Sequence, residues 1–335
     1  HHATMGRALR VFSSTTSNTS ALSMRESNLR SRITTSTATL PVVAILCGTV
    51  WVANLDTTPT GTGVVALVAV MTYLMVELNA RHALLRVRSR MVSTMFLLVA
   101  TALPWALTLT EALTATALTA MLFPLFAVYQ GGRRPGLVYY MGVCLAIGSM
   151  AYPPMLLLSL PLLAAMAIFL RVLNARHFFA LLFGMVTPYW IAAAWGLWQG
   201  CADAMADQWL QQWTFTAPCY DALPAPAITG AALIAGISVP AIVHTLRTAY
   251  NDKIRTRMYF YTLTVLHLTL LGALAAQPQH YAMLLPLLTV TTAPLAAHHF
   301  TLSRGRSALL WFIICLTAIA AVIVGKICML HGIVR

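Results

Sequence analysis

Apolar stretches long enough to cross a bilayer alternate with short polar segments along most of the chain. A helix rises about 1.5 Å per residue, so about 20 apolar residues cross the hydrocarbon core of a membrane. No water is available there to bind the backbone, and such stretches must therefore be helical. The pattern predicts an all-α, polytopic transmembrane helix bundle of about 11 spans, at residues 36–55, 61–79, 91–110, 112–130, 137–151, 155–170, 178–198, 226–246, 258–276, 281–299 and 308–328.

Two of these spans, 137–151 and 155–170, are short and are joined by Tyr152, Pro153 and Pro154. Proline lacks a backbone donor and bends or ends a helix. The pair could therefore be a re-entrant hairpin instead of two full crossings, which would leave about 9 to 11 spans. Either arrangement returns the chain to the same side, so the remaining topology is unchanged.

Composition agrees with a membrane protein, since 59% of the residues are hydrophobic and only 9% are charged. A soluble domain has roughly 45–50% and 25%. The net charge of +13 would suggest nucleic-acid binding in a soluble protein. Here, however, the cations fall in alternate loops, as the positive-inside rule describes, and we expect no nucleic-acid partner. These clusters are Arg81, Arg86, Arg88 and Arg90; Arg133 and Arg134; Arg171 and Arg176; Arg247, Lys253, Arg255 and Arg257; Arg304 and Arg306.

The same rule predicts a bacterial inner (plasma) membrane protein with its N-terminus in the cytoplasm and its C-terminus outside. All 21 Lys and Arg residues except Lys326 and Arg335, that is 19, then lie on the cytoplasmic side. Five of the eight acids fall at the opposite face: Asp56, Glu111, Asp203, Asp207 and Asp221.

The chain divides into a tail and one membrane domain. Residues 1–35 are rich in Ser, Thr and Arg and are predicted to be a disordered cytoplasmic tail, and residues 36–330 form the membrane domain. The outer loop at 199–225 alternates aromatic and acidic residues, which predicts a short amphipathic helix at the membrane surface. Cys201 and Cys219 share this loop, where an oxidising compartment permits the disulfide that we predict between them.

Motifs of soluble enzymes are missing, since the chain has no Walker loop, HExxH or GxSxG. An ATP-driven pump would therefore need a partner that supplies the ATPase. No Cys and His spacing indicates a metal site, and none is predicted.

Glu77 precedes Arg81 by four residues, and a helical ion pair explains it without a function. His267 lies near the middle of its span, where an ionisable group is a functional candidate. The alternative is a neutral imidazole bonded to a neighbouring helix, and both interpretations remain open. His244 and Arg247 share one helix face near the cytoplasmic end of their span. They could hold an anionic headgroup or phosphate, or simply extend to the interface.

The outer face carries the candidate catalytic acids. Asp56 follows the first span and Glu111 follows the third, and either could act as a general base on a lipid-linked substrate. Asp203 and Asp207 are four residues apart and, together with His280, could bind substrate or a divalent cation. Solvated helix ends are the alternative explanation.

The stretch from Gly136 through Pro154, followed by apolar residues to Leu170, the basic pair Arg171 and Arg176, and Pro188-Tyr189-Trp190, resembles the middle of GT-C type membrane glycosyltransferases. The resemblance implies a lipid-linked sugar as substrate and an acidic first outer loop, to which Asp56 would correspond. The chain is also similar to uncharacterised inner-membrane proteins of Bacteroidetes, through residues 77–81, 86–91 and 148–154.

Three functions follow from these observations. The first is handling of a lipid-linked sugar in cell-envelope polysaccharide assembly, by a glycosyltransferase-like enzyme or an assembly protein in contact with membrane lipids. The second is a secondary transporter, motivated by His267 and by Pro286 and Pro294 in one span. The third is a non-catalytic membrane subunit of a larger complex. The position and chemistry of a cavity would separate the three.

Overall fold

The computed structural model describes residues 33–53, 58–129, 134–213, 215, 217–221, 223–303 and 305–330. The secondary structure of these residues is helical, and no strand occurs among them. The all-α prediction is therefore confirmed. The helices are α2 (Thr39–Ala53), α3 (Pro59–His82), α4 (Met91–Thr101), α5 (Leu109–Ala127), α6 (Pro135–Ala151), α7 (Ser159–Ile168), α8 (Ala175–Gln199), α9 (Ala202–Gln211), α10 (Ala225–Thr248), α11 (Ile254–Ala276), α12 (Tyr281–Leu302) and α13 (Arg306–Leu330), with 3₁₀ turns η1 (Pro153–Leu158), η2 (Ala249–Asn251) and η3 (Pro278–His280).

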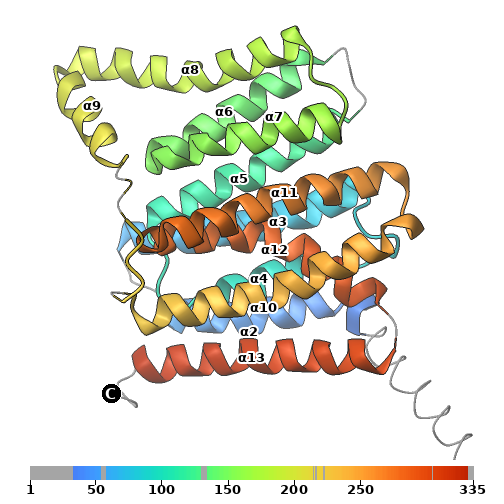
Figure 1. Ribbon diagram of the computed structural model, residues 1–335. Coiled ribbons are helices and arrows are strands. Elements are labelled where there is room, and N and C mark those ends of the chain that lie inside the picture. Colours follow the sequence, from blue (N-terminus) through green and yellow to red (C-terminus); the bar gives the residue numbers. More distant parts are fainter. Residues whose placement is uncertain are drawn as a thin grey trace, which may run out of the picture.

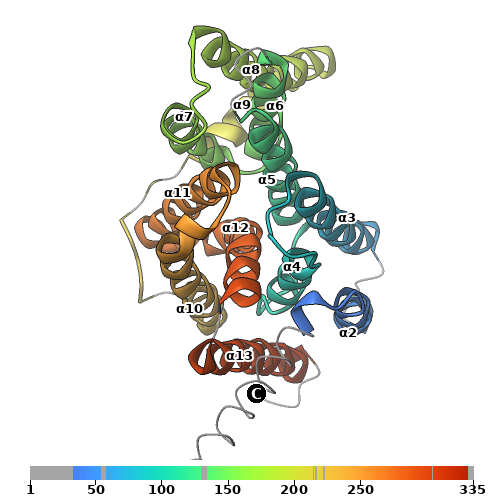
Figure 2. The same ribbon diagram turned by 90° about the vertical axis from the view of Figure 1, so that its right-hand side faces the viewer.

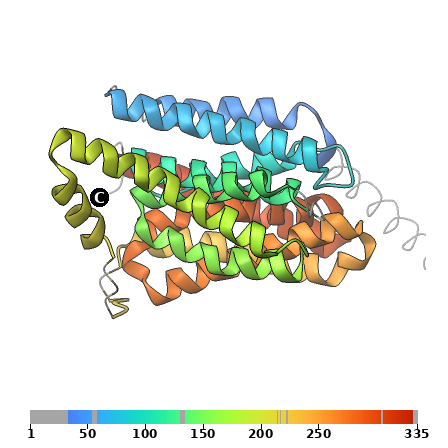
Figure 3. The same cartoon turned by 90° about the horizontal axis from the view of Figure 1, so that it is seen from above.

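Seven helices in the described part of the chain are long and apolar enough to cross a membrane, namely α3, α5, α8, α10, α11, α12 and α13. The chain is thus a multi-pass membrane protein. Four shorter apolar helical segments, α2, α4, α6 and η1 with α7, occupy the remaining predicted spans. Each predicted span overlaps a helix, and the long helices lie along roughly one common axis when seen from above (Figure 3).

Two predicted spans differ from the helices that replace them. The span at 91–110 is helical only to Thr101, because Pro104 cannot donate a backbone hydrogen bond and the chain up to Thr108 is irregular. Nearly all of α4 is buried, which is typical of a short core helix. The pair at 137–170 reverses direction at η1, which begins at Pro153, and α7 then packs against α11 rather than against α6 (Figure 2).

Helices α3, α5, α10 and α12 end, and α4, α8, α11 and α13 begin, at the same end of the bundle, which brings the arginine-rich loops together (Figure 1). We call this the basic end; it contains the loop 83–90 and the segments 171–174, 249–253 and 303–306, with Arg304 outside the described residues. The predicted tail, residues 1–35, also lies outside the described residues except for 33–35. Those three are helical, and Thr34 is buried with its carbonyl accepting a hydrogen bond from Ser89 Oγ.

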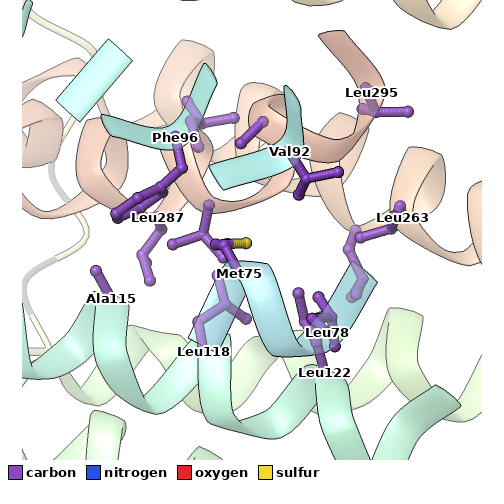
Figure 4. Packing of buried hydrophobic residues seen from close by; sticks show 14 of the residues in the cluster. Met75, Leu78, Val92, Phe96, Ala115, Leu118, Leu122, Leu263, Leu287 and Leu295 are labelled. Atoms are coloured by element: carbon purple, nitrogen blue, oxygen red, sulfur yellow. The ribbon is translucent and has the colours of Figure 1, made fainter. Parts of the chain in front are cut away.

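The core lies where α12 passes between α4, α5, α10 and α11, with α3 packed against α4 and α5 (Figure 2). Interlocking Met75, Leu78, Leu118, Leu122 and Leu287 fill it, and each of these side chains is fully buried (Figure 4). Lipid is as apolar as leucine, so close packing, more than water exclusion, holds membrane helices together. This packing fixes α12 and its polar side chains in the middle of the bundle.

Helices α6 and α8 touch along their backbones at Gly142 and Gly184. A Cβ added at Gly142 would lie 2.8 Å from the amide nitrogen of Met185, and one added at Gly184 would lie 3.1 Å from the Cα of Gly142. Only glycine permits this approach. Hydrogen bonds from Tyr139 Oη to Thr187 Oγ1 (3.1 Å) and between Ser149 Oγ and Tyr189 Oη (2.6 Å) extend the contact.

Candidate functional site

A cavity of about 710 Å³ opens at the basic end, between α3, the loop 83–90, the start of α4 and residues 35–37. Its polar side carries three cations from the loop, Arg86, Arg88 and Arg90, and hydroxyls from the neighbouring segments. Its apolar side comes from α3 and α4 and includes Met75 and Val92. The cavity therefore joins a strongly basic rim to an apolar wall.

The loop that carries these arginines is held in place by α3 and by its own leucines. Ala83 adopts a left-handed conformation (φ 48°) that ends α3, and Leu84 and Leu85 are buried in the core. The Asn79 amide then spans the loop, since its Nδ2 donates to the Ser89 carbonyl (2.8 Å) and its Oδ1 accepts from the Leu85 amide (3.3 Å). A side-chain amide has both a donor and an acceptor, which suits this bridge.

Arg86 connects the cavity to a buried ionic network. Its Nε lies 2.9 Å from Asp252 Oδ1, and its Nη1 donates to the Asn251 carbonyl at 2.9 Å. The other carboxylate oxygen, Asp252 Oδ2, lies 2.9 Å from His298 Nε2. The side chains of Asp252 and His298 are 2% and 1% exposed, whereas that of Arg86 is 41% exposed. The network thus leads from the cavity surface into the bundle. Pairing within it offsets the free-energy cost of burying these charged and polar groups.

The second imidazole nitrogen continues the chain of contacts. His298 Nδ1 lies 3.4 Å from Thr245 Oγ1 on α10, and the Thr245 hydroxyl donates to the Ala241 carbonyl at 2.8 Å. Because that hydroxyl hydrogen is already used, Thr245 can only accept from the imidazole. Both imidazole nitrogens of His298 therefore have a polar partner, Asp252 on one side and Thr245 on the other.

His244 and Arg247, which we expected to share one helix face, lie in two different environments. The His244 ring packs into a histidine cluster, 4.6 Å from His299 and 5.9 Å from His298 between ring centroids. Arg247 is exposed at the same end of the bundle and does not line the cavity. Only the histidine therefore joins the buried network.

The outer acids are not brought together among the described residues, and Asp56 lies outside those residues. Glu111 is buried at the opposite end, where its Oε2 accepts from the Thr108 amide (3.1 Å) and Trp105 Nε1 (3.4 Å). This is the capping box of α5, which gives Glu111 a structural role. Lys326, which we expected on the outer side, lies near the end of α13, is buried and donates to the Trp105 carbonyl at 3.0 Å.

Asp203 and Asp207 lie on α9, the helix within the predicted outer loop, and both are exposed. Their spacing places them on one helix face, as expected. His280 packs against Tyr152 with ring centroids 5.6 Å apart, and burial raises the pKa of the Tyr152 hydroxyl above its usual range. No group of three or more potential metal ligands occurs in the described ranges.

The predicted disulfide is not formed, because Cys201 and Cys219 are both free thiols. Cys201 caps the start of α9 beside α8, with its Sγ 3.7 Å from Met205 Sδ. The neighbour of Cys219, Tyr220, donates its hydroxyl to the Ala275 carbonyl at the end of α11. The ten-residue helix α9 lies between the two cysteines in the chain.

His267 is fully buried on α11, and its Nδ1 lies 2.8 Å from Thr291 Oγ1 on α12. Glu77 forms the expected ion pair with Arg81.

We did not predict Asp252, His298 and Thr245 from the sequence. The available signal was one acid, Asp252, among the cations of its loop, together with a His-His pair at the end of a span that reaches the same face.

No family model matches the chain, and no curated protein or solved structure matches it either.

Proposed function

We propose that the protein handles a phosphate-bearing lipid, the class to which a lipid-linked sugar belongs, by binding its phosphate in the cavity at the basic end. The cavity itself carries this proposal, because three arginines and an apolar wall face the same space. Its volume of about 710 Å³ lies within the range of roughly 300–1,000 Å³ that small-molecule sites occupy. From the positive-inside rule we propose that this end faces the cytoplasm and that the protein lies in a bacterial inner membrane.

The arginines suit a phosphate in both charge and shape. A guanidinium is planar and can donate two parallel hydrogen bonds to phosphate oxygens. Asp252 and Asn251 hold one edge of the Arg86 guanidinium, which fixes its plane and leaves other N–H groups for a ligand. Arg88 and Arg90 are exposed and add two further positive charges. The apolar wall formed by α3 and α4 would receive the first part of a lipid chain.

The same geometry favours binding over sugar transfer at this site. Group transfer needs a carboxylate or other base within hydrogen-bond reach of the reacting proton. Asp252 is the acid nearest to the arginine rim in the described part of the chain, and its two oxygens already face Arg86 and His298. We therefore propose a role in holding or presenting a lipid-linked substrate within envelope polysaccharide assembly.

The test compares ligands that separate the contribution of the phosphate from that of the lipid chain. The full chain, purified in detergent, is titrated with a long-chain isoprenoid phosphate, the matching isoprenoid alcohol, inorganic phosphate, and an anionic phospholipid. Preference for the isoprenoid phosphate over both the alcohol and the phospholipid is expected. Equal binding of the phospholipid would assign the cavity to general lipid headgroups, and tighter binding of inorganic phosphate would assign it to a soluble anion.

Variants locate the binding. The double substitution R88Q/R90Q changes exposed side chains that line the cavity, and R247Q changes an exposed arginine at the same end outside it. A hydrogen bond to a charged group contributes about 1.5–3 kcal/mol. R88Q/R90Q should therefore weaken isoprenoid phosphate binding about tenfold or more, while R247Q leaves it unchanged. Equal affinities for the two variants would refute the proposal.

A further inference from the structure

The polar side chains of α10, α11 and α12 form two layers inside the bundle. The inner layer, next to the basic end, contains Thr245, His298 and Asp252. The second layer contains His267 and Thr291, which contact each other at 2.8 Å. All five residues are buried. Thr291 and His298 are seven residues apart on α12, so they lie on the same face and about 10 Å apart along the helix.

The parallel course of α10 and α12 indicates that Ser238 belongs to the second layer. Helices α10 and α12 both run toward the basic end, and Thr245 of α10 contacts His298 of α12 (Figure 1). Seven residues earlier on each helix are Ser238 and Thr291, which should therefore occupy the same relative positions two turns deeper. Ser238 is fully buried. The second layer thus lies near the middle of all three helices, at about the depth of the membrane centre.

Several polar atoms at this depth lack a hydrogen-bond partner among the described residues. They include His267 Nε2, Ser238 Oγ and Thr292 Oγ1, and each belongs to a residue that is fully buried. Pro294 has no N–H, so the Val290 carbonyl one turn earlier loses its usual helix donor. A buried polar group without a partner costs about 1–3 kcal/mol. Water molecules that bridge such groups remove the cost, and a site needs two to four polar partners to hold one.

We propose that these layers form a water-assisted proton pathway that connects the basic end with His267 at the membrane centre. A proton arriving from the cavity side binds His298, where Asp252 and Thr245 accept hydrogen bonds from the imidazolium. His298 passes its Nδ1 proton to the Thr245 hydroxyl, which gives its own proton to water. His267 takes up a proton from water at Nε2 and returns a proton to water at the same nitrogen. No bond other than N–H and O–H changes, and each histidine returns to its neutral form.

The surroundings of the two histidines differ in charge. His298 contacts Asp252, which in turn contacts Arg86. The rings of His244 and Phe260 also pack near it, with the Phe260 ring centroid 4.4 Å from that of His298, and His299 is the next residue in the sequence. The titratable and charged residues on the helices packed against His267 lie at the helix ends. They are His244 and Arg247 on α10, Tyr281, His298 and His299 on α12, and His280 on the 3₁₀ turn η3, with none on α7. His298 is therefore the titratable group through which His267 is expected to exchange protons with the basic end.

Exchange of the imidazole Cε1 hydrogen with deuterium, followed by mass spectrometry, tests this pathway. The reaction requires water at the ring and its rate rises with pH through the imidazole pKa. In the full chain in lipid nanodiscs, His267 should exchange within tenfold of the half-buried His280 and show a sigmoidal pH profile. Exchange at His267 more than a hundredfold slower than at His280, with no pH dependence, would overturn the proposal.

Two variants test whether the two layers exchange protons. H298Q removes the inner proton carrier, and D252N keeps the shape of the side chain but removes its charge. Each should slow exchange at His267 at least tenfold and leave His280 unchanged. Intact thermal unfolding of either variant shows that it has folded, so the two provide independent tests. Unchanged exchange at His267 in both would also overturn the pathway. The test does not involve the ligand of the cavity, so it stands apart from the proposed lipid binding.

Discussion

The glycine contact between α6 and α8 gives a sharp prediction about stability. In G184A the new Cβ would lie 3.1 Å from the Gly142 Cα and closer still to the Tyr139 carbonyl oxygen. Carbon atoms in contact prefer about 3.5–4.0 Å, so the two backbones must separate by about half an ångström or more. A gap of that size removes about a quarter or more of each dispersion contact along the interface. Overpacking of this kind costs about 1–3 kcal/mol, and we expect the upper part of that range because both obstacles are backbone atoms.

The assay is unfolding by SDS or heat in detergent micelles, followed by tryptophan fluorescence, since α8 carries Trp190, Trp195 and Trp198. The matched control is G272A on α11, where an added Cβ meets nothing within 4 Å. Alanine favours a helix over glycine by up to about 1 kcal/mol, so this control should be neutral or stabilising. The double variant G142A/G184A should cost little more than G184A, because one separation relieves both contacts. Equal stability of G184A and G272A would refute the reasoning.

Two further predictions concern the ends of the bundle. E111A should lower the free energy of unfolding by about 1–2 kcal/mol, because the capping box of α5 is lost and two partly buried donors lose their acceptor. E77Q, which removes a partly exposed ion pair, should change it by less than about 1 kcal/mol, and equal effects in the same unfolding assay would contradict the role given to Glu111. In a cysteine-free background, V87C and D207C should react with a membrane-impermeant maleimide from opposite sides, and labelling of both from one side would end the predicted topology.

The helices could be predicted from the sequence because the membrane imposes one length scale and one backbone solution on every span. Departures occurred where a local residue competes with that rule. Pro104 ends α4 early, and the chain that follows still contributes buried residues such as Leu103. Hydrophobicity alone cannot separate a buried irregular turn from a continuing helix, because both avoid water. The Cys201 and Cys219 pair failed for a related reason, since sharing a loop says nothing about the helix that lies between them.

The candidate site was harder to predict because its members lie far apart in the chain. Arg86 and Asp252 belong to different loops, and neither loop length nor charge shows which loops meet across a bundle. Glu111 illustrates the opposite error. Its position at an outer helix end suggested exposure, whereas the sequence Thr108-Leu-Thr-Glu111 is itself a capping box. That local pattern was present in the sequence and indicated a structural role without any tertiary information.

Asp252 shows how the charge rule that orients a membrane protein can also conceal a site. The rule counts Lys and Arg and gives little weight to acids, so one carboxylate among Arg247, Lys253, Arg255 and Arg257 does not alter the topology. A solvated carboxylate there would gain little from neighbouring cations, because surface ion pairs contribute at most about 1 kcal/mol. A buried one must find partners, since an unpaired buried charge is strongly unfavourable. A lone acid in a basic loop, facing a span that ends in histidines, therefore points to a buried network more than to a solvated loop.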